Sequence, residues 1–154
     1  MSTIRAARSQ DIEAIIELCA EHAAYEQCEY RREGKALALA QFLFSEQPPL
    51  HCLVVEASGG DLLGYATYSF EFSTWRAGFF THMDCLYLRP HARGSGLGAK
   101  LLEQIAVHTR RRGLTQMQWQ TPATNERAIA FYLRLPASLQ EKCRFTYDLG
   151  GDHA

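Results

Sequence analysis

The chain has 154 residues, of which 47% are hydrophobic and 21% are charged, a balance typical of one globular domain that covers residues 1–154. A formal net charge of −1 argues against nucleic acid as a partner, because affinity for phosphate depends on a basic surface. Five cysteines without a C-x-x-C pair argue against disulfides and against a metal site. The sequence shows no apolar leader and no run near ~18 apolar residues, so we expect a cytoplasmic protein with no membrane partner.

The N-terminal part predicts a strand, a helix and a polar loop. Residues 3–7 form a short strand, and Ser9 is a suitable N-cap for a helix in which apolar residues recur at helical spacing from Ile12 to Ala23. The pattern then loosens over residues 25–30. This loop is either a polar surface connection or a substrate contact, and its candidate contacts are Tyr25, Glu26 and Glu29.

A second helix and three strands are expected next. The helix covers residues 34–45 and is ended by two prolines. Its buried side chains should be Leu37, Leu39 or Ala40, Phe42 and Leu43. Residues 51–57 and 62–70 form a hairpin around the turn Gly59-Gly60-Asp61, and residues 79–88 add a third strand. Because short loops join the three strands, we expect them to be antiparallel.

The rest of the chain is organised around residues 82–102, where a strand, a turn and three alternating glycines lead into a helix. Pro90 has no N–H and therefore stops the strand. The glycines allow left-handed backbone angles and remove side chains that would block a ligand; they are Gly94, Gly96 and Gly98. The first N–H groups of the helix have no intrahelical partner, so the stretch predicts a phosphate site with Arg93 as a mobile cation at its edge.

The glycines also fit the dinucleotide fingerprint G-x-G-x-x-G/A. That fingerprint needs an acidic residue roughly 20 positions later to hold a ribose, and residues 114–121 contain no carboxylate. It also usually opens its fold, whereas this loop lies past the middle of the chain. A pyrophosphate that is not part of NAD fits better, and a glycine turn without a ligand is the remaining alternative.

The C-terminal part adds more α/β structure. Residues 97–112 form the main helix with Gly113 as its C-cap, and residues 114–121 form a strand. A strand–helix–strand passage implies that this strand has a parallel partner. A last helix over residues 125–133 leads to a final strand at residues 144–149. The order of elements predicts an α/β fold with a mixed, mostly antiparallel sheet flanked by helices.

Several motifs in this order resemble the GCN5-related N-acetyltransferase (GNAT) superfamily. Arg93-Gly94-Ser95-Gly96-Leu97-Gly98 matches the acetyl-CoA loop Q/R-x-x-G-x-G/A. Over nearly its whole length the chain is similar to the diamine (spermidine/spermine) N-acetyltransferase branch. The motifs that carry this likeness are Asp11-Ile12, Tyr25-Glu26, His51-Cys52-Leu53-Val54, Phe72-Ser73-Thr74-Trp75, Leu86-Tyr87-Leu88-Arg89-Pro90 and residues 125–132.

The resemblance implies that acetyl-CoA donates an acetyl group to an amine in a ternary complex, with no metal. It implies a sheet that splays at the acetyl-CoA site, with pyrophosphate held by loop amides and pantetheine paired with a strand edge. The implied acetyl-CoA-binding residues are Leu86, Leu88, Arg93, Gly94, Ser95, Gly96, Leu97, Gly98 and Asn125. A homodimer is a weaker implication, supported by a density of aromatic residues over residues 70–80.

The resemblance also assigns catalytic roles. Tyr132 occupies the position of the family's general acid, and a phenol of pKa about 10 is a suitable proton donor to a departing thiolate. Asp84 occupies the place of a strand glutamate that accepts the amine proton. It lies in an apolar strand, where a buried carboxylate is rare without a partner or a purpose, and His82 shares its face. Because aspartate is one methylene shorter than glutamate, a water relay is favoured.

The acceptor is expected to be a small primary amine. The site offers few carboxylates for a polyamine, so a less cationic amine is at least as suitable. The expected substrate contacts are Tyr25, Glu26, Glu29 and His82. A protein lysine or N-terminal acetyltransferase and a non-catalytic acyl-CoA-binding module are alternatives. The presence of both Asp84 and Tyr132 argues against a module without turnover.

Overall fold

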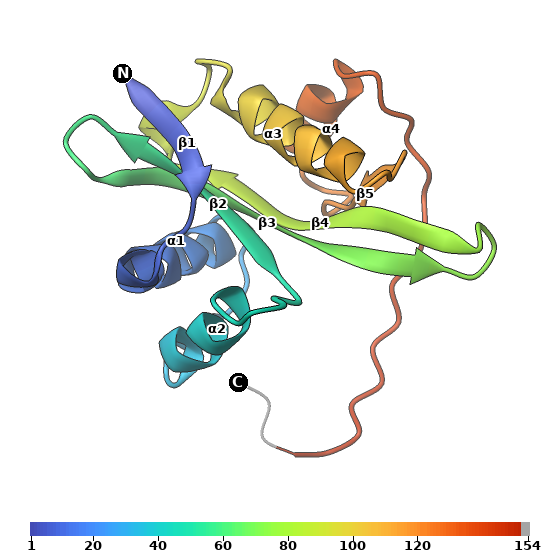
Figure 1. Cartoon of the computed structure of the whole chain (residues 1–154), viewed down its shortest axis with the longest axis horizontal. Helices are drawn as coiled ribbons and strands as arrows, with labels where there is room; N and C mark the ends of the chain where they lie inside the picture. The colour runs from blue at the N-terminus through green and yellow to red at the C-terminus, as the bar shows by residue number, and fades with distance from the viewer. Residues whose placement is uncertain (152–154) are drawn as a thin grey trace. The chain divides into compact units, whose positions relative to one another are not determined.

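The computed structural model describes residues 1–151. They fall into two compact units, residues 1–120 and a second unit that begins at Thr121 (Figure 1).

The first unit is built on a five-stranded sheet. Its strands are β1 (Ser2–Ala6), β2 (His51–Ala57), β3 (Leu62–Ser73), β4 (Gly78–Leu88) and β5 (Met117–Trp119). They lie side by side in chain order; the first four are antiparallel neighbours, and β5 is parallel to β4. The structure therefore confirms the predicted hairpin of β2 and β3, the antiparallel pairing of β4 with β3, and the parallel pairing of β5 with β4.

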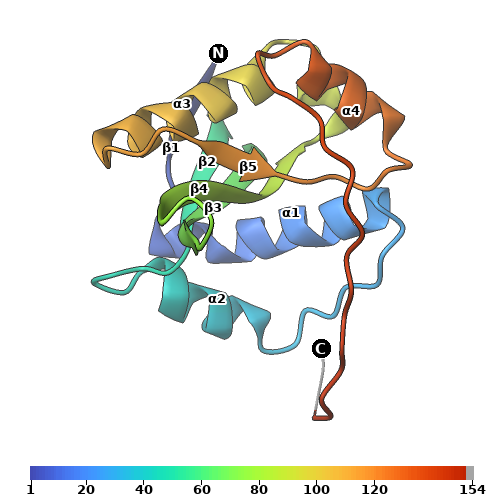
Figure 2. The ribbon, with the colours of Figure 1, turned by 90° about the vertical axis from the view of Figure 1, so that its right-hand side faces the viewer.

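Helices cover both faces of this sheet. Helices α1 (Ile12–Tyr25) and α2 (Lys35–Leu43) lie on one face, and α3 (Leu97–Arg111) lies on the other (Figure 2). Ile15 and Leu18 of α1 are fully buried in a cluster that includes Tyr65 of β3. Ile15 belongs to the apolar face predicted from the helical spacing, and Leu18, which was not predicted, lies one turn further along it, so the core forms where this face of α1 meets the sheet.

Two details of the N-terminal helices differ from the prediction. Ser9 does not cap α1, because residues Ser9–Asp11 form a short 3-10 turn in which the Asp11 carboxylate accepts the N–H of Arg8 at 2.7 Å. In α2 only Leu43 is buried, whereas Leu37 and Phe42 are 71% and 54% exposed. The helix is only nine residues long and presents one edge to the core, so its other apolar side chains remain outside.

The sheet splays between β4 and β5. The two strands pair only at Thr81–Met83, where β5 provides Met117–Trp119. Residues 84–88 of β4 extend past this ladder, and within the described part of the chain no other strand pairs with that edge. The strand expected over residues 114–121 is therefore shorter than predicted, and the unpaired edge of β4 remains available to an extended ligand.

The second unit contains one helix, α4 (Glu126–Leu133), as predicted. The final strand expected over residues 144–149 is wrong, because residues 134–151 form no strand. Phe145, Tyr147 and Leu149 do alternate with polar residues, but they are 93%, 85% and 84% exposed. An alternating segment becomes a strand only where a neighbour completes its hydrogen bonds and buries its apolar face.

None of the helices formed by residues 1–151 is long and apolar enough to cross a membrane.

Candidate active site

The glycine loop connects the end of β4 to the N-terminus of α3. Gly94 and Gly96 both have a φ of 81°, in the left-handed region that favours glycine. A Cβ atom added at either position would meet nothing within 4 Å, so a ligand can reach the backbone of both residues. Gly98 is different, because it is a buried residue of α3 with helical angles, and the prediction of a left-handed angle there is wrong.

The first N–H groups of α3 are available to a ligand. Gly96 is the N-cap and has no side chain to offer them. The hydroxyl of Ser95 donates to the carbonyl of Ala92 at 3.0 Å, away from the helix. Leu97 is buried and anchors the first turn. Unpaired N–H groups and the partial positive charge of a helix N-terminus together suit a phosphate.

Arg93 is held in place, in contrast to the mobile cation that we expected. Its Nε donates to the carbonyl of Leu88 at 2.8 Å. Its guanidinium carbon lies 4.7 Å from the ring centre of Tyr25 and 5.5 Å from that of Tyr87. Two aromatic faces attract the cation, so the structure brings Leu88 and Arg93, from the end of β4 and the loop after it, together with Tyr25 at the end of α1.

The strand β4 is irregular at Asp84. Cys85 pairs with Thr67 of β3 and Met83 pairs with Tyr68, so Asp84 is an extra residue without a partner, a β-bulge. Its side chain is 62% exposed, and the expectation of a buried carboxylate is wrong. The bulge lies where β4 leaves β5, which opens the surroundings of the side chain to solvent.

His82 and Asp84 do lie together, as predicted. The Nε2 atom of His82 is 3.9 Å from an Oδ1 atom of Asp84. Leu86, which follows on the same open stretch of β4, pairs with Ala66 of β3 on its other side. The backbone of residues 84–88 and the carboxylate of Asp84 therefore share one open edge of the sheet.

A cluster around His22 lies on the α1 face of the sheet. The His22 Nδ1 atom is 2.9 Å from the hydroxyl of Tyr65, its Nε2 atom is 3.7 Å from a carboxylate oxygen of Glu26, and its ring stacks on Tyr87 at 5.2 Å. Burial lowers the pKa of His22, and Glu26 and Asp84 oppose this effect through their negative charge. His22 is therefore mainly neutral at neutral pH and can accept a proton.

Of the predicted substrate contacts in the loop after α1, Glu26 joins this cluster and Glu29 does not. Glu29 is exposed and has no ion pair or hydrogen bond with any described residue. Sequence reasoning missed His22, although one signal was present. His22 and Glu26 are four residues apart on a helix, a spacing at which side chains meet.

An ion pair that the sequence does not reveal fixes the geometry of this face. The Glu21 carboxylate accepts from Nη2 of Arg89 at 2.9 Å and from its Nε at 3.1 Å, a two-point contact between residues 68 positions apart. The hydroxyl of Tyr87 donates to the same carboxylate at 3.5 Å. The pair fastens the last turns of α1 to the end of β4, just before the glycine loop.

The thiol of Cys85 is not poised as a nucleophile. Burial, followed by the nearby charge of Asp84, raises the pKa of Cys85 to about 12. A thiol with this pKa is protonated at neutral pH, whereas nucleophilic attack requires the thiolate. Within residues 1–151, no group of three or more His, Cys, Asp or Glu side chains is arranged to hold a metal ion.

The two remaining predicted residues lie in the second unit. Asn125 is the N-cap of α4, and its side-chain oxygen accepts the N–H of Ala128 at 3.2 Å. This bond uses the side-chain oxygen of Asn125, and its amide NH₂ group keeps two N–H donors. Tyr132 lies seven residues later in the last turn of α4, half-buried, with its ring centre 5.2 Å from that of Phe131.

Comparison with known proteins identifies the family. Residues 9–135 match the model of the acetyltransferase (GNAT) family. A thialysine N-epsilon-acetyltransferase of Bos taurus is 32% identical over 141 residues, which cover 87% of this chain and 82% of that protein. A D-amino-acid N-acetyltransferase of Saccharomyces cerevisiae is 25% identical over 132 residues, 86% of this chain and 82% of that protein.

A solved structure has the same fold. An aminoglycoside acetyltransferase from an uncultured soil metagenomic sample superposes with a TM-score of 0.82, covering 97% of each chain at 15% identity. At this identity the likeness concerns the fold alone. The family match carries the function: the chain belongs to the GNAT family of acetyltransferases and is an N-acetyltransferase.

Proposed function

We propose that this N-acetyltransferase moves an acetyl group from acetyl-CoA to the side-chain primary amine of a small amino acid analogue, by direct transfer in a ternary complex. The similarity to a thialysine N-epsilon-acetyltransferase over 87% of the chain carries this proposal. A second relative is named for acetylating D-amino acids, which supports an amino acid as the acceptor. We also propose that residues 1–154 act as one catalytic domain, because the family match continues across residue 120.

The charges of the first unit support an acceptor with one ammonium group. Glu26 and Asp84 are the carboxylates that surround His22, and Glu21 is already paired with Arg89. A polyamine carries several positive charges and would need more free carboxylates than these two. The rings of Tyr25 and Tyr87 lie beside them and suit the apolar part of a short aminoalkyl chain.

The amine must lose its proton before it attacks. We propose that Asp84 accepts this proton through a water molecule, because its exposed carboxylate is accessible to solvent. His22 is a second acceptor, favoured by its lowered pKa and by the carboxylates near it. His82, 3.9 Å from Asp84, would orient the carboxylate.

The glycine loop fits acetyl-CoA, because its left-handed glycines leave the backbone N–H groups open. Residues 94–98 and Arg93 would hold the pyrophosphate, the open edge at Leu86 and Leu88 would hold the pantetheine, and the amide of Asn125 would add a contact. Bound acetyl-CoA supplies the thioester. We propose from the family resemblance that Tyr132 donates its phenolic proton to the departing sulfur.

A panel of amines tests the proposed acceptor. We expect release of CoA thiol to be fastest with thialysine or another short amino acid with a side-chain amine, slower with spermidine, and absent with N-acetylated thialysine. Preferential turnover of spermidine would contradict the amino acid assignment. Turnover limited to peptides would assign the enzyme to protein substrates.

We propose further that the protein is a cytoplasmic homodimer. Phe72, Trp75 and Phe79 surround the turn between β3 and β4 and are 59%, 99% and 53% exposed. Their concentration at one end of the sheet supports contact with a second copy. The five free cysteines support a reducing compartment. Light scattering should give about twice the 17.4 kDa mass of one chain, and Trp75→Ser should shift the protein toward the monomer.

A further inference from the structure

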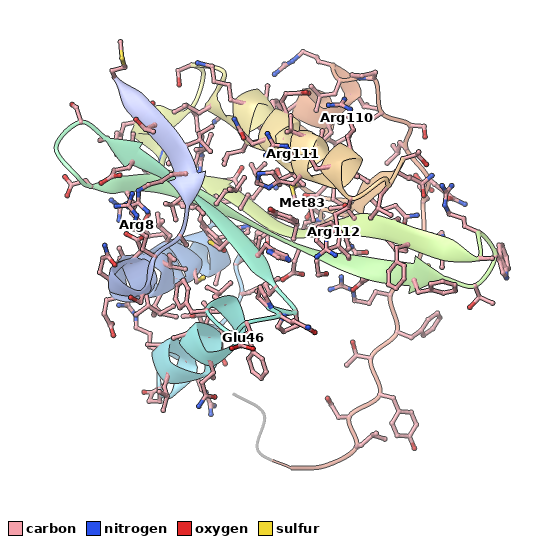
Figure 3. The ribbon with its side chains drawn as sticks, viewed as in Figure 1. Arg8, Glu46, Met83, Arg110, Arg111 and Arg112 are labelled. Atoms are coloured by element: carbon pink, nitrogen blue, oxygen red, sulfur yellow. The ribbon has the colours of Figure 1, made fainter. Side chains whose placement is uncertain are left out.

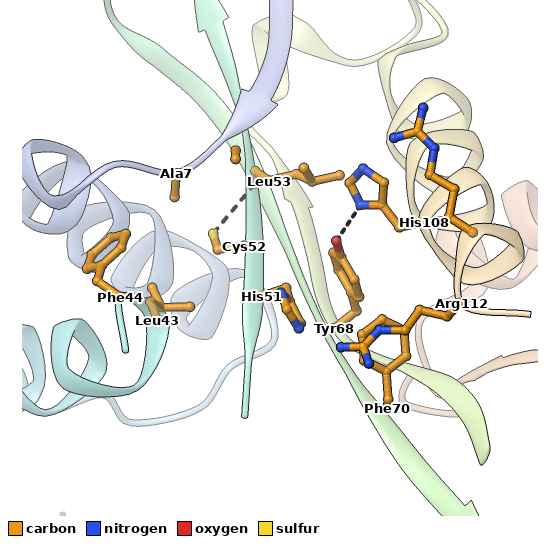
Figure 4. A pocket seen from close by; sticks show the side chains of 12 residues that line it. Ala7, Leu43, Phe44, His51, Cys52, Leu53, Tyr68, Phe70, His108 and Arg112 are labelled. Atoms are coloured by element: carbon orange, nitrogen blue, oxygen red, sulfur yellow. Dashed lines mark hydrogen bonds between the residues drawn. The ribbon is translucent and has the colours of Figure 1, made fainter. Parts of the chain in front are cut away.

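A pocket of about 390 Å³ opens at the end of the sheet remote from the glycine loop. It lies where β1 ends and β2 begins, between the last residues of α2 and the last turn of α3. Its walls include Phe44, His51, Tyr68, Phe70, His108 and Arg112 (Figure 4). Because α3 has 15 residues and a helix rises 1.5 Å per residue, about 20 Å separate this pocket from the glycine loop.

The pocket is lined by cations without carboxylates. Arg111 and Arg112 contribute to it, and no Asp or Glu among residues 1–151 does. In the run Arg110-Arg111-Arg112 at the end of α3 (Figure 3), only Arg110 has an acidic partner among the described residues, Glu103 at 3.0 Å. The guanidinium of Arg112 lies over the ring of Phe70 at 4.1 Å. The run is therefore more than a solvated helix end, because one of its members is fixed at the mouth of a cavity.

His51 brings an unsatisfied polar atom to this pocket. Its ring stacks on Tyr68 at 5.2 Å and meets the edge of Phe70 at 5.3 Å. Its Nε2 atom is buried and has no hydrogen-bond partner in the described part of the chain. A buried polar atom without a partner is costly, so a ligand that reached this nitrogen would gain by supplying the missing hydrogen bond.

The other titratable groups that face His51 are His108, Arg112 and Tyr68. Burial lowers the pKa of His51, and the positive charges of Arg112 and His108 lower it further. The hydroxyl of Tyr68 is taken by Nδ1 of His108 at 2.5 Å. None of the described residues that line the pocket carries a negative charge, and its aromatic and aliphatic walls continue toward Leu43.

We propose that this pocket binds a small organic carboxylate, with its carboxylate between Arg112 and Nε2 of His51 and its apolar body against Phe44 and Leu43. The guanidinium supplies a charged donor that suits a carboxylate. Bound negative charge favours the protonated form of His51, so binding tightens as pH falls. The site is independent of acetyl transfer, because none of its walls belongs to the glycine loop or to the His22 cluster.

Benzoate is a suitable probe, with benzamide as its neutral counterpart and inorganic phosphate as an anion without an apolar body. NMR signals of the His51 and His108 rings report on the pocket directly. Benzoate should shift both in a saturable manner and raise the pKa of His51, whereas benzamide and phosphate should bind more weakly. Arg112→Leu and His51→Phe should each reduce benzoate affinity at least several-fold, while the matched variant Arg110→Leu should keep it.

Three results would overturn the proposal. The first is the absence of a saturable shift of His51 with benzoate in the wild-type protein. The second is equal binding of benzamide or phosphate, which would show that the carboxylate or the apolar body is not recognised. The third is unchanged benzoate affinity in Arg112→Leu. Thermal melting and acetyl-CoA affinity of each variant confirm that it is folded.

Discussion

Strand β3 carries two tyrosine–histidine pairs, one on each face of the sheet. Tyr65 meets Nδ1 of His22 at 2.9 Å on the side of α1, and Tyr68 meets Nδ1 of His108 at 2.5 Å on the side of α3. The tyrosines are three residues apart, so they point to opposite faces. In both pairs burial lowers the pKa of the histidine.

The two pairs differ in the charges around them. Glu26, 3.7 Å from His22, and Asp84 oppose the lowered pKa of His22, and Arg93 adds to it. By contrast, the charges that act on His108 and His51 are all positive: Arg111 acts on His108, and Arg112 and His108 act on His51. Under our two proposals, the same side-chain pair serves an ammonium group on one face and a carboxylate on the other. Neighbouring charge, and not the histidine itself, sets the kind of ligand.

The glycine loop would hold an anion through backbone N–H groups, whereas the arginine-lined pocket would hold one through side chains. The largest expected effect is on acetyl-CoA affinity when the backbone of the loop is changed. Gly96→Val should abolish acetyl-CoA binding, because the added side chain enters the open cradle and strains a residue with φ of 81° by about 1–3 kcal/mol. Calorimetry with acetyl-CoA checks this. Benzoate binding should remain, and Gly59→Val, at an open position without a left-handed angle, is the matched control. Normal acetyl-CoA affinity in a folded Gly96→Val protein would place the cofactor elsewhere.

Two conservative substitutions separate catalysis from the carboxylate pocket. Tyr132→Phe should lower kcat by roughly 10²–10⁴, the usual contribution of a positioned acid, with little change in acetyl-CoA affinity. His51→Phe, which also replaces a polar ring with an apolar one, should leave kcat unchanged because it acts only on the pocket. Steady-state release of CoA thiol measures both. A kcat within a few-fold of wild type for Tyr132→Phe would assign thiolate protonation to another group.

Asp84→Asn tests the acidic face at the bulge. The variant should slow transfer at neutral pH, and the defect should shrink toward the pKa of the amine, because more substrate is then already neutral. Stability should change little, since the Asp84 carboxylate is 62% exposed and lies 3.9 Å from His82, and ion pairs of exposed groups contribute about 0–1 kcal/mol. The measurements are kcat/KM from about pH 6 to about pH 10 and the melting temperature. A destabilised variant with a pH-independent defect would make Asp84 a structural residue.

Arg93→Ala should weaken acetyl-CoA binding by about 1–3 kcal/mol through the loss of a charge-assisted phosphate contact. The structure adds a second reason, because Arg93 also fastens the loop to Leu88 and Tyr25. Arg93→Lys keeps the charge but lacks the planar group that stacks on Tyr25. Calorimetry should therefore give it an intermediate affinity. Equal affinity for both variants and wild type would remove Arg93 from the phosphate site.

A feature can be predicted from the sequence when the residues that cause it lie close together along the chain. Helical spacing and glycine positions predict α1, α3 and the loop, because their signals lie within a few residues. The bulge at Asp84 depends on the register of β4 against β3, which no local pattern reveals. The contact between Glu21 and Arg89 joins residues 68 positions apart for the same reason.

Two of the wrong predictions, the strand over residues 144–149 and the buried carboxylate at Asp84, have one cause. The apolar alternation at Phe145, Tyr147 and Leu149 and the apolar surroundings of Asp84 both suggested sheet interiors. An alternating pattern shows that a segment can pair, but not that a partner is present. The pocket at His51 was equally invisible, because its walls come from β1, α2, β2, β3 and α3.

The smallest expected effect is a loss of folding stability in acid, and it differs between the histidines of the two faces. A lowered pKa means that the folded state binds a proton less readily than the unfolded state, so stability is fully present above the ordinary pKa of 6.5 and is lost as pH falls below it. The pKa of His51 is lowered by burial and by positive neighbours, whereas at His22 two carboxylates oppose the effects of burial and of Arg93.

Urea unfolding at about pH 7.5 and about pH 5.5 should therefore show a lower midpoint in acid. His51→Phe should recover more of this loss than His22→Phe, because at His51 both burial and charge disfavour protonation. Asp11, whose pKa is lowered by its bond with Arg5, contributes the same stability at both pH values, because that contribution is lost only below about pH 4. An equal acid loss in wild type and His51→Phe would mean that the arginine-lined pocket does not hold its histidine neutral.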